Sequence, residues 1–497
     1  MTERNNVPDV IRRRHDESVA GIVNTLQWVI IALTLAFIFR CFIAEAFRIP
    51  TGSMAETLSG DHYQIRCDMC GYKYDLGTDH LSTPKPKCPN CGYRIPQKTD
   101  LKPSHGDRIF VHKSIYQFSE PKRWDVVVFR YPGDPRDNYI KRLIALPGET
   151  LEIFDGDIYI DGRIQRKPKH VQEEMWMPLY DSDYVPYIYG SEDADNPTDF
   201  HWRVPFVNAE DSNWNTDSGY AYTLDSPQIN TLYFDSGNGD KFRAFYAYNN
   251  TTRFRNPPIC TDLKIRFDVE IPEKGLYLVG AIIEKHSRRF RASLDATGSM
   301  TIGEVGSDGK SEELGRSNII IPFDGSIHME FAVLDHQLIF TVGKNTLIYD
   351  FGLSPDSMGP VDPTVYPNVS ITGLGKLKLS HIALFRDEHY VSSSSIRARK
   401  ERPFVLGEDE FFMCGDNSMD SSDSRMWPDE GKGNYYLDSD GDRVVKHFRP
   451  GVVPREYLVG KAFFLYWGDA FEPFANTVPM IPNLTEMKII YGGSENK

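Results

Sequence analysis

The chain has 497 residues, of which 40% are hydrophobic and 25% are charged, as is usual for a globular protein. Its formal net charge of -14 at pH 7 argues against a nucleic-acid partner, because no basic face is available to neutralise phosphates. The 26 tyrosines and 29 phenylalanines favour strands. The composition therefore predicts a mainly β protein of about two to four domains.

The first predicted element is an apolar segment near the N-terminus. No charged residue interrupts residues 18–39, which at about 1.5 Å per residue are long enough to cross a bilayer core of about 30 Å. An arginine cluster at 12–14 predicts a cytoplasmic N-terminus at 1–17. The alternative is a cleavable signal peptide, but its apolar region runs only about 7–15 residues. We therefore expect a single-pass transmembrane anchor at 18–43, with the rest of the chain outside the cytoplasm.

A Pro/Gly turn follows the anchor and carries Ser53. One interpretation is a helix cap, because Glu56 stands three residues further on, as in a capping box. The other is a nucleophile at the membrane surface, which requires a base beside its hydroxyl. In that case the Thr51 hydroxyl and the Ser53 N–H could donate to a developing oxyanion.

Two cysteine pairs come next, and each pair is followed by Gly-Tyr. Cys67-x2-Cys70 and Cys88-x2-Cys91 are separated by residues 71–87, a spacing typical of zinc sites. The pattern resembles a zinc ribbon, in which four thiolates hold a structural zinc ion. The alternative is a pair of disulfides in an oxidising compartment. We expect a zinc-ribbon insert at 65–95.

Strand-like segments follow the cysteines, and one of them carries Lys141. Alternation places Tyr139, Lys141 and Leu143 on one face of the strand and Arg142 on the other. A lysine base must be neutral, so its pKa must fall from about 10.4 by roughly 2.5–3 units, or about 4 kcal/mol of desolvation. The alternative is a solvated lysine at a sheet edge. The segment at 151–160 predicts a hairpin.

From 171 to 395 the chain is rich in Asp, Asn, Ser, Gly and aromatic residues. Short alternating segments at 263–269, 327–333 and 337–342 predict strands, and many short strands with frequent turns favour a β-sandwich. The strand rhythm of its second half resembles a concanavalin-like or laminin-G-like jelly roll. We expect an inserted domain that acts as a spacer or docking surface, or that binds a glycan or a protein.

Strand character of the earlier kind returns at about 404, and a polar loop follows it. Gly415-Asp416-Asn417 is a turn signal. Asp423 and Arg425 face the same way in an extended segment and could pair, and Ser421 could hydrogen-bond a buried lysine. The alternative is a calcium-binding loop. We expect one mostly antiparallel β core, an unassigned tail at 471–497, and core segments at 44–64, 104–170 and 400–470.

Taken in order, four motifs resemble those of the bacterial type I signal peptidases. The motifs are Pro-Thr-Gly-Ser-Met, Gly-Asp-Arg-Ile, Tyr-Ile-Lys-Arg-Leu-Ile-Ala-Leu-Pro-Gly-Glu and Gly-Asp-Asn-Ser-Met-Asp-Ser-Ser-Asp-Ser-Arg. These enzymes are membrane-anchored serine/lysine endopeptidases that remove signal peptides from exported proteins. The resemblance spans residues 25–64, 104–165 and 404–468, and the long inserts are departures from the family's pattern.

The resemblance implies a role for each matching residue. Ser53 would be the nucleophile, Lys141 the general base, Thr51 an oxyanion-hole residue and Ser421 the residue that orients the lysine, and Asp423 and Arg425 would form a supporting ion pair. The positions that would line shallow pockets for small side chains of an Ala-x-Ala site are Phe47, Ile49, Pro50, Met54, Leu58, Tyr139 and Ile140.

The resemblance also implies preproteins as substrates, the bacterial inner membrane as the location, and catalysis without a cofactor. Two other functions are weighed against it. A surface binding protein would carry an inactive core, which the intact Ser53 and Lys141 speak against. A self-cleaving serine/lysine repressor would need a DNA-binding helix pair, and the sequence predicts none.

Overall fold

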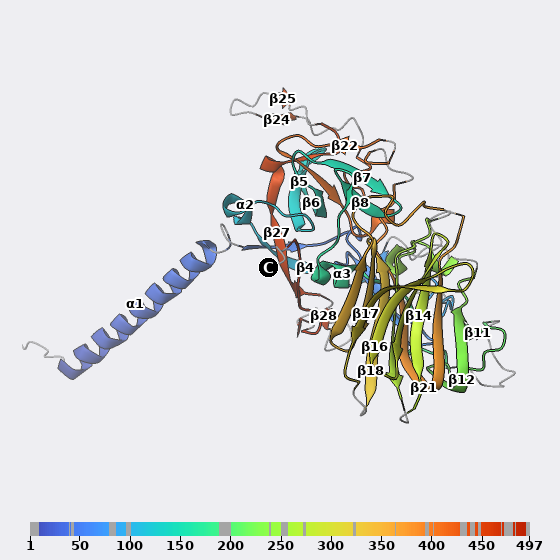
Figure 1. The fold of residues 1–497 in the computed structure, drawn as a ribbon. Coiled ribbons are helices and arrows are strands. Elements are labelled where there is room, and N and C mark those ends of the chain that lie inside the picture. Colours follow the sequence, from blue (N-terminus) through green and yellow to red (C-terminus); the bar gives the residue numbers. More distant parts are fainter. Residues whose placement is uncertain are drawn as a thin grey trace, which may run out of the picture.

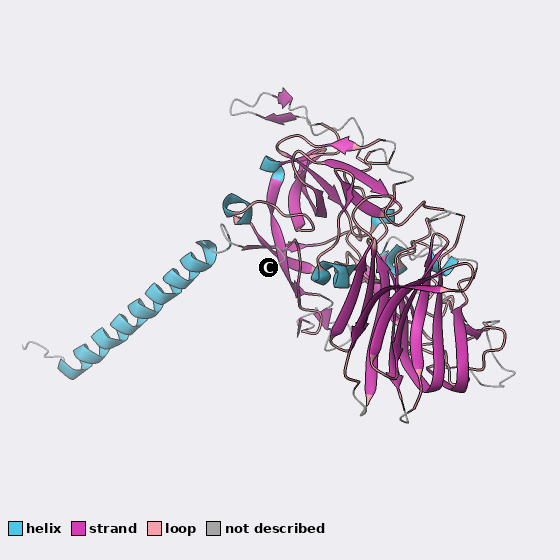
Figure 2. Ribbon diagram, viewed as in Figure 1, coloured by secondary structure: helices cyan, strands magenta, loops and turns pink. Residues whose placement is uncertain are grey.

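The computed structural model of the protein describes most of the chain (Figure 1). The described residues are 9–38, 40, 44–78, 86–95, 101–187, 200–237, 240–249, 257–271, 275–321, 325–362, 364–392, 397–400, 402–427, 435–437, 443–445, 449–468, 470–471, 481–482 and 484–493. Strands dominate the folded body, which confirms the predicted mainly β class (Figure 2).

A single long helix, α1 (Asp9–Ile38), projects from the β-rich body in Figure 1. Within the described part of the chain, no helix combines the length and the apolar character that crossing a membrane requires. The single-pass anchor predicted at 18–43 is therefore not confirmed and stays a prediction. Residues 39 and 41–43 of that segment lie outside the described residues.

An antiparallel eight-stranded sheet forms the core. Its order is β1-β4-β27-β5-β6-β23-β26, with β30 paired to β27, so segments from both ends of the chain lie side by side. The bounds are β1 (Ala44–Arg48), β4 (Arg108–His112), β5 (Val126–Tyr131), β6 (Asp134–Ala145), β23 (Glu410–Cys414), β26 (Val453–Pro454), β27 (Leu458–Trp467) and β30 (Lys488–Ile489). Strand β30 lies in the tail at 471–497, for which no structure was predicted.

A second, small sheet packs beside the first and has the order β22-β7-β8-β9. Strands β7 and β8 form the hairpin expected at 151–160, and Asp155 and Gly156 at its turn have φ of 53° and 90°. The bounds are β22 (Phe404–Val405), β7 (Thr150–Phe154), β8 (Asp157–Ile160) and β9 (Arg163–Ile164). Strands from before and after the long insert thus pair within each of the two sheets.

The insert forms a twelve-stranded sheet around one hydrophobic cluster. The 19-residue β21 is its centre: β14 pairs with residues 368–374 of it, β12 with 370–380, β13 with 378–386 and β10 with 383–386. The strands are β10 (Met177–Asp181), β11 (Phe206–Asn208), β12 (Ala221–Phe234), β13 (Leu263–Glu270), β14 (Leu278–Lys285), β15 (Arg288–Asp295), β16 (Ser299–Val305), β17 (Ser311–Asn318), β18 (Ser326–Leu334), β19 (Gln337–Val342), β20 (Asn345–Asp350) and β21 (Asn368–Arg386).

Short elements complete the described fold. Strand β2 pairs with β3 beside the cysteines, and the turn η4 of the insert contacts β3. The helices are α2 (Ile115–Phe118), α3 (Lys169–Met175), η3 (Asp240–Phe242), η4 (Ala247–Asn249), η5 (Ser418–Asp420) and η6 (Arg455–Tyr457), and the strands are β2 (His62–Arg66), β3 (Lys73–Gly77), β24 (Tyr435–Leu437), β25 (Arg443–Val445), β28 (Ala470–Phe471) and β29 (Ile481–Pro482).

Candidate active site

Ser53 lies in the turn between β1 and β2. Residues 51–58 form turns and bridges and no helix, so Ser53 does not cap one. The Ala55 N–H donates to the Gly52 carbonyl over 3.0 Å, and the Ile49 N–H donates to Asp107 over 2.9 Å. These bonds hold the turn against the start of β4. Ser53 is 8% exposed, so its hydroxyl sits at the edge of the interior.

The side chain of Lys141 reaches this turn from β6. Its Nζ lies 2.6 Å from Ser53 Oγ and 2.9 Å from the Ile140 carbonyl oxygen. Lys141 is 4% exposed, so it is not a solvated residue of a sheet edge. Burial lowers the pKa of Lys141 to about 8, and the charges of Asp423 and Asp416 oppose this shift only in part. A buried amine of this kind can accept a proton near neutral pH.

Alternation along β6 separates the neighbours of Lys141 as expected. Leu143 packs in one cluster with Tyr139, whereas Ile140 packs in another with Met54. Arg142 forms a fully buried, bidentate pair with Asp416, at 2.8 and 2.6 Å. The sequence pattern placed Arg142 on the other face of the strand from Lys141, but it did not predict this partner.

Asp423 and Arg425 form a second buried ion pair. It lies in the loop that follows β23, residues 415–425, which we call the C-terminal loop. Arg425 Nε lies 2.9 Å and Nη2 lies 2.6 Å from the two oxygens of Asp423. Burial alone would raise the pKa of the Asp423 carboxyl, but the adjacent Arg425 guanidinium holds that pKa below its usual range. The Gly415 N–H also donates to Asp423 over 3.0 Å. The pair therefore fixes the loop that carries Gly415.

That loop lies directly on the turn at residues 51–58 that carries Ser53. The Asn417 N–H donates to the Ser53 carbonyl over 3.1 Å, and Asn417 Nδ2 donates to the Gly52 carbonyl over 2.9 Å. A Cβ on Gly415 would lie 2.3 Å from both the Ser53 carbonyl oxygen and Ser421 Oγ, so only glycine fits there. Ser421 is thus near the site, but Lys141 Nζ makes its hydrogen bonds to Ser53 and Ile140.

The residues expected to line substrate pockets divide into two groups by exposure. Ile49, Met54 and Leu58 are buried in one cluster with residues of β4 and β5. The others have accessible surface: the ring of Tyr139 stacks on Tyr131 at 4.4 Å between centroids, and the remaining three are Phe47, Pro50 and Ile140. Thr51 is exposed on the same turn. The accessible side chains are those that a bound peptide can contact.

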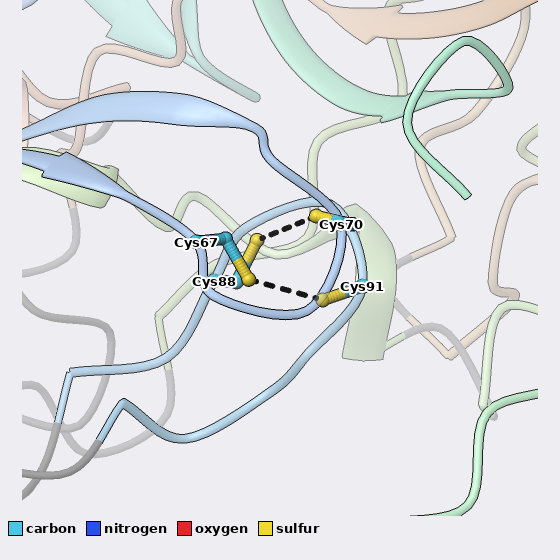
Figure 3. Close-up of side chains that lie close together, drawn as sticks. All are labelled: Cys67, Cys70, Cys88 and Cys91. Carbon is cyan, nitrogen blue, oxygen red and sulfur yellow. Dashed lines mark hydrogen bonds between the residues drawn. The ribbon is translucent and has the colours of Figure 1, made fainter. Parts of the chain in front are cut away.

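The four predicted cysteine ligands form a compact cluster (Figure 3). Cys67 Sγ lies 3.7 Å from Cys91 Sγ, and Cys70 Sγ lies 3.7 Å from Cys88 Sγ. All four thiols are free, and a disulfide would require about 2.05 Å. A tetrahedral zinc with Zn–S bonds of about 2.3 Å has S···S edges of about 3.8 Å. The spacing therefore fits zinc.

Two glycine turns shape this cluster. The Gly71 N–H donates to the Cys67 carbonyl over 2.9 Å, and the Gly92 N–H donates to the Cys88 carbonyl over 3.0 Å. Both glycines have positive φ, 75° and 80°, which a side chain would strain. Hydrogen bonding to Cys67 raises the pKa of the Cys91 thiol, and a bound cation would favour ionisation of all four thiols.

A second group of buried carboxylates lies where the insert joins the small sheet. Two lysines form ion pairs with this group: Lys167 Nζ lies 2.7 Å from Asp387, and Lys285 bonds Asp262. We interpret the group as an ion-pair network that links core and insert. Its carboxylates are those of Asp157, Asp262, Asp335 and Asp387.

Comparison with known proteins identifies relatives of the core. Residues 96–197 and 376–467 match the model of the family "Signal peptidase, peptidase S26". "Signal peptidase I" of Rickettsia akari (strain Hartford) is 35% identical over 135 residues, 27% of this chain and 41% of that protein. "Signal peptidase I" of Rickettsia prowazekii (strain Madrid E) is 34% identical over 135 residues, 27% of this chain and 42% of that protein. These matches confirm the resemblance to bacterial type I signal peptidases.

The matches cover only part of each protein. This chain spans about two-fifths of the length of the curated relatives. Lys141 and Asp423 lie inside the ranges that match the family, whereas Ser53 lies before the first of them. The position of Ser53 therefore rests on the sequence motif and on its contact with Lys141.

Two solved structures that resemble part of the chain share little sequence with it. "Carbohydrate binding module CBM66 from Bacillus subtilis" is 7% identical, with a TM-score of 0.24, over 37% of this chain and 96% of that one. "Sheep Galectin-11 (LGALS11) complex with glycerol" is 9% identical, with a TM-score of 0.20, over 32% and 98%. TM-scores this low do not define a shared fold.

Sequence reasoning missed several residues of the site. It treated Asp416 and Asn417 only as turn residues. Both are fully buried, and Asn417 contacts the turn that carries Ser53. It placed no residue of the insert near Ser53, whereas Asn249 bonds Asn417. A turn signal could have marked Asn417 as structured, but no local pattern links residue 249 to residue 417.

The buried pair at Asp423 gives a stability prediction. Arg425→Met would leave a fully buried carboxylate unpaired, so we expect a loss of about 3–5 kcal/mol in the free energy of unfolding, measured by urea titration. The control is Arg136→Met, because Arg136 pairs with Asp134 while 87% exposed and should cost at most about 1 kcal/mol. Equal unfolding midpoints for the two variants would contradict the assignment.

Proposed function

We propose that this protein is a serine endopeptidase that removes N-terminal signal peptides from exported proteins. The observation that carries the proposal is the 2.6 Å contact between Ser53 Oγ and Lys141 Nζ, in a setting that lowers the pKa of Lys141 to about 8. The confirmed resemblance to type I signal peptidases supplies the reaction and the substrate class. An inactive binding protein would have no need of a desolvated amine at this position.

In the proposed reaction, Ser53 Oγ attacks the carbonyl carbon of the scissile peptide bond while Lys141 Nζ takes the hydroxyl proton. The lysine then gives that proton to the leaving amine, and the C–N bond breaks to leave an acyl-enzyme. Water activated by the same amine hydrolyses the ester and frees Ser53. Every proton that moves is held by Lys141, so the chemistry needs no cofactor.

The oxyanion that develops needs donors beside Ser53. We propose the Ser53 N–H and the Thr51 hydroxyl for this role. Among the described residues the Ser53 N–H has no hydrogen-bond acceptor, which leaves it available to a substrate oxygen. Ser421 would orient Lys141 once a substrate is bound, and the Asp423–Arg425 pair would hold the loop around it.

Substrate selection would follow from the surface around the serine. Shallow apolar subsites accept small side chains and exclude large ones, which favours Ala-x-Ala cleavage sites. We assign these subsites to the accessible Phe47, Pro50, Tyr139 and Ile140, with the buried Ile49, Met54 and Leu58 as the floor beneath them. A glycan or protein ligand of the twelve-stranded insert stays a prediction of the sequence.

The dyad gives a first test. Ser53→Ala and Lys141→Met should abolish cleavage of a purified preprotein, and Lys141→Arg should fail at every pH because a guanidinium stays protonated. For the wild-type protein, the rate should fall about tenfold per pH unit below about pH 8, because protonated Lys141 cannot act as a base. Gel assays of preprotein processing across pH measure both effects.

The controls are a serine and a lysine nearby. Ser59 lies on the same turn, but its hydroxyl donates to Asp75 over 2.9 Å, so Ser59→Ala should keep cleaving. Lys113→Arg should also keep cleaving, since Lys113 only pairs with Glu45 near the surface. Robust processing by the Lys141→Arg protein would overturn the assignment of the base.

Zinc is proposed for the cysteine cluster as a structural ion. Elemental analysis of the purified protein should find about one zinc per chain, and Cys88→Ser should lose most of it, because a closed site needs four ligands. The control is Cys260→Ser, which removes a buried free thiol outside the cluster and should keep the zinc. Absence of zinc from the wild-type protein would refute the proposal.

Attachment to a lipid bilayer through α1 is also proposed. The helix presents large apolar side chains to its surroundings, including Trp28, Leu33, Leu35 and Phe37, each at least 61% exposed. A run of this kind is expected to be covered by lipid. After alkaline extraction of bacterial membranes, the full chain should stay in the pellet, while a chain that lacks residues 1–43 should be released. Release of the full chain would contradict membrane attachment.

A further inference from the structure

One short turn of the insert contacts the turn of the core that carries Ser53. The turn η4 (Ala247–Asn249) carries Asn249, which is 1% exposed although it belongs to an otherwise separate sheet domain. Burial of a side-chain amide is costly unless its polar atoms are bonded. The hydrogen-bond partners of Asn249 must therefore compensate for the cost of its burial.

Asn249 exchanges two hydrogen bonds with Asn417. Asn249 Nδ2 donates to Asn417 Oδ1 over 2.7 Å, and Asn417 Nδ2 donates to Asn249 Oδ1 over 2.7 Å. The same Asn417 Nδ2 also donates to the Gly52 carbonyl over 2.9 Å. Both hydrogens of that amide are therefore used, and Asn249 fixes the direction in which the second one points.

The bond to Gly52 helps to set the orientation of the peptide that precedes Ser53, together with the Ala55 N–H, which donates to the same carbonyl over 3.0 Å. The Gly52 carbonyl and the Ser53 N–H belong to one planar trans peptide, so they point in opposite directions. When Asn417 holds the carbonyl on its side, the Ser53 N–H is directed to the other side. That N–H is the backbone donor assigned above to the oxyanion.

A second residue of η4 supports the same turn. A Cβ on Gly52 would lie 1.9 Å from Cε1 of the Tyr248 ring, so the ring packs directly on the glycine. Tyr248 Oη donates to the Asp61 carbonyl over 2.8 Å, and the Asp61 N–H donates to the Pro50 carbonyl over 3.2 Å. The turn is thus held between the insert and the C-terminal loop.

We propose that Asn249 is a positioning residue of the active site: through Asn417 it fixes the Gly52–Ser53 peptide and aims the oxyanion donor. The insert is then a working part of the peptidase and not an independent appendage. The inference rests on the proposed function, because it assigns Asn249 an effect on the same reaction. Asn249 touches no reacting atom and acts only through Asn417.

The test compares the kinetics of variants in the full-length protein, with a synthetic peptide that carries an Ala-x-Ala site. We expect Asn249→Ala to lower kcat by about 10- to 100-fold, as small misplacements of catalytic groups do, with KM changed less than about threefold. The acid limb of the pH profile should stay where it is, because the pKa of Lys141 is set mainly by its burial and, in the opposite direction, by the charges of Asp423 and Asp416. Asn249→Asp keeps the acceptor for Asn417 Nδ2 and should retain more activity than Asn249→Ala.

Asn230→Ala is the matched control for stability. Asn230 is an equally buried asparagine of the same insert, and it bonds only the Asn213 N–H and the Gln228 carbonyl, so its loss should leave kcat unchanged. A double variant of Asn249→Ala and Asn417→Ala should be no slower than Asn417→Ala alone, because both changes break one chain of bonds.

Three results would overturn the inference while leaving the proposed function intact. They are a wild-type kcat for Asn249→Ala, a kcat loss equal to that of Asn230→Ala, and additive losses with Asn417→Ala. A wild-type protein that cleaves no Ala-x-Ala peptide would instead overturn the proposed function, and this inference with it.

Discussion

The structure depends on one unfavourable placement, the amine of Lys141 buried against the Ser53 hydroxyl. Desolvation disfavours the ammonium form and lowers the pKa of Lys141 to about 8. The nearby carboxylates of Asp416 and Asp423 act in the opposite direction. Each of them is bonded bidentately by its own arginine, which limits its pull on the lysine. The two buried ion pairs thus make a lysine of lowered pKa compatible with acidic neighbours.

The same two ion pairs organise the backbone around the serine. One ties β6 to the start of the C-terminal loop, and the other closes that loop onto Gly415. Glycine at 415 allows the loop to contact the Ser53 carbonyl, and Asn417 then bonds both carbonyls of the turn. Charge compensation and the placement of Ser53 therefore depend on one set of residues.

The inserts are joined to the core through this turn as well as through their chain connections. Strand β3, which belongs to the cysteine-bearing insert at 65–95, contacts η4 of the twelve-stranded insert. In turn, η4 packs on Gly52 and Asn417. These contacts join both inserts to the candidate active site.

The sequence by itself determined the mainly β class, the strand alternation around Lys141, the hairpin at 151–160 and the spacing of the four cysteines, because these patterns depend on residues close together in the chain. Tertiary structure decided the partner of Arg142, the contact of Asn417 with the turn that carries Ser53, and the hydrogen bonds between Asn249 and Asn417. Each of these joins residues more than one hundred positions apart, or segments of separate sheets. Such contacts follow from how sheets pack and close, which no local periodicity encodes.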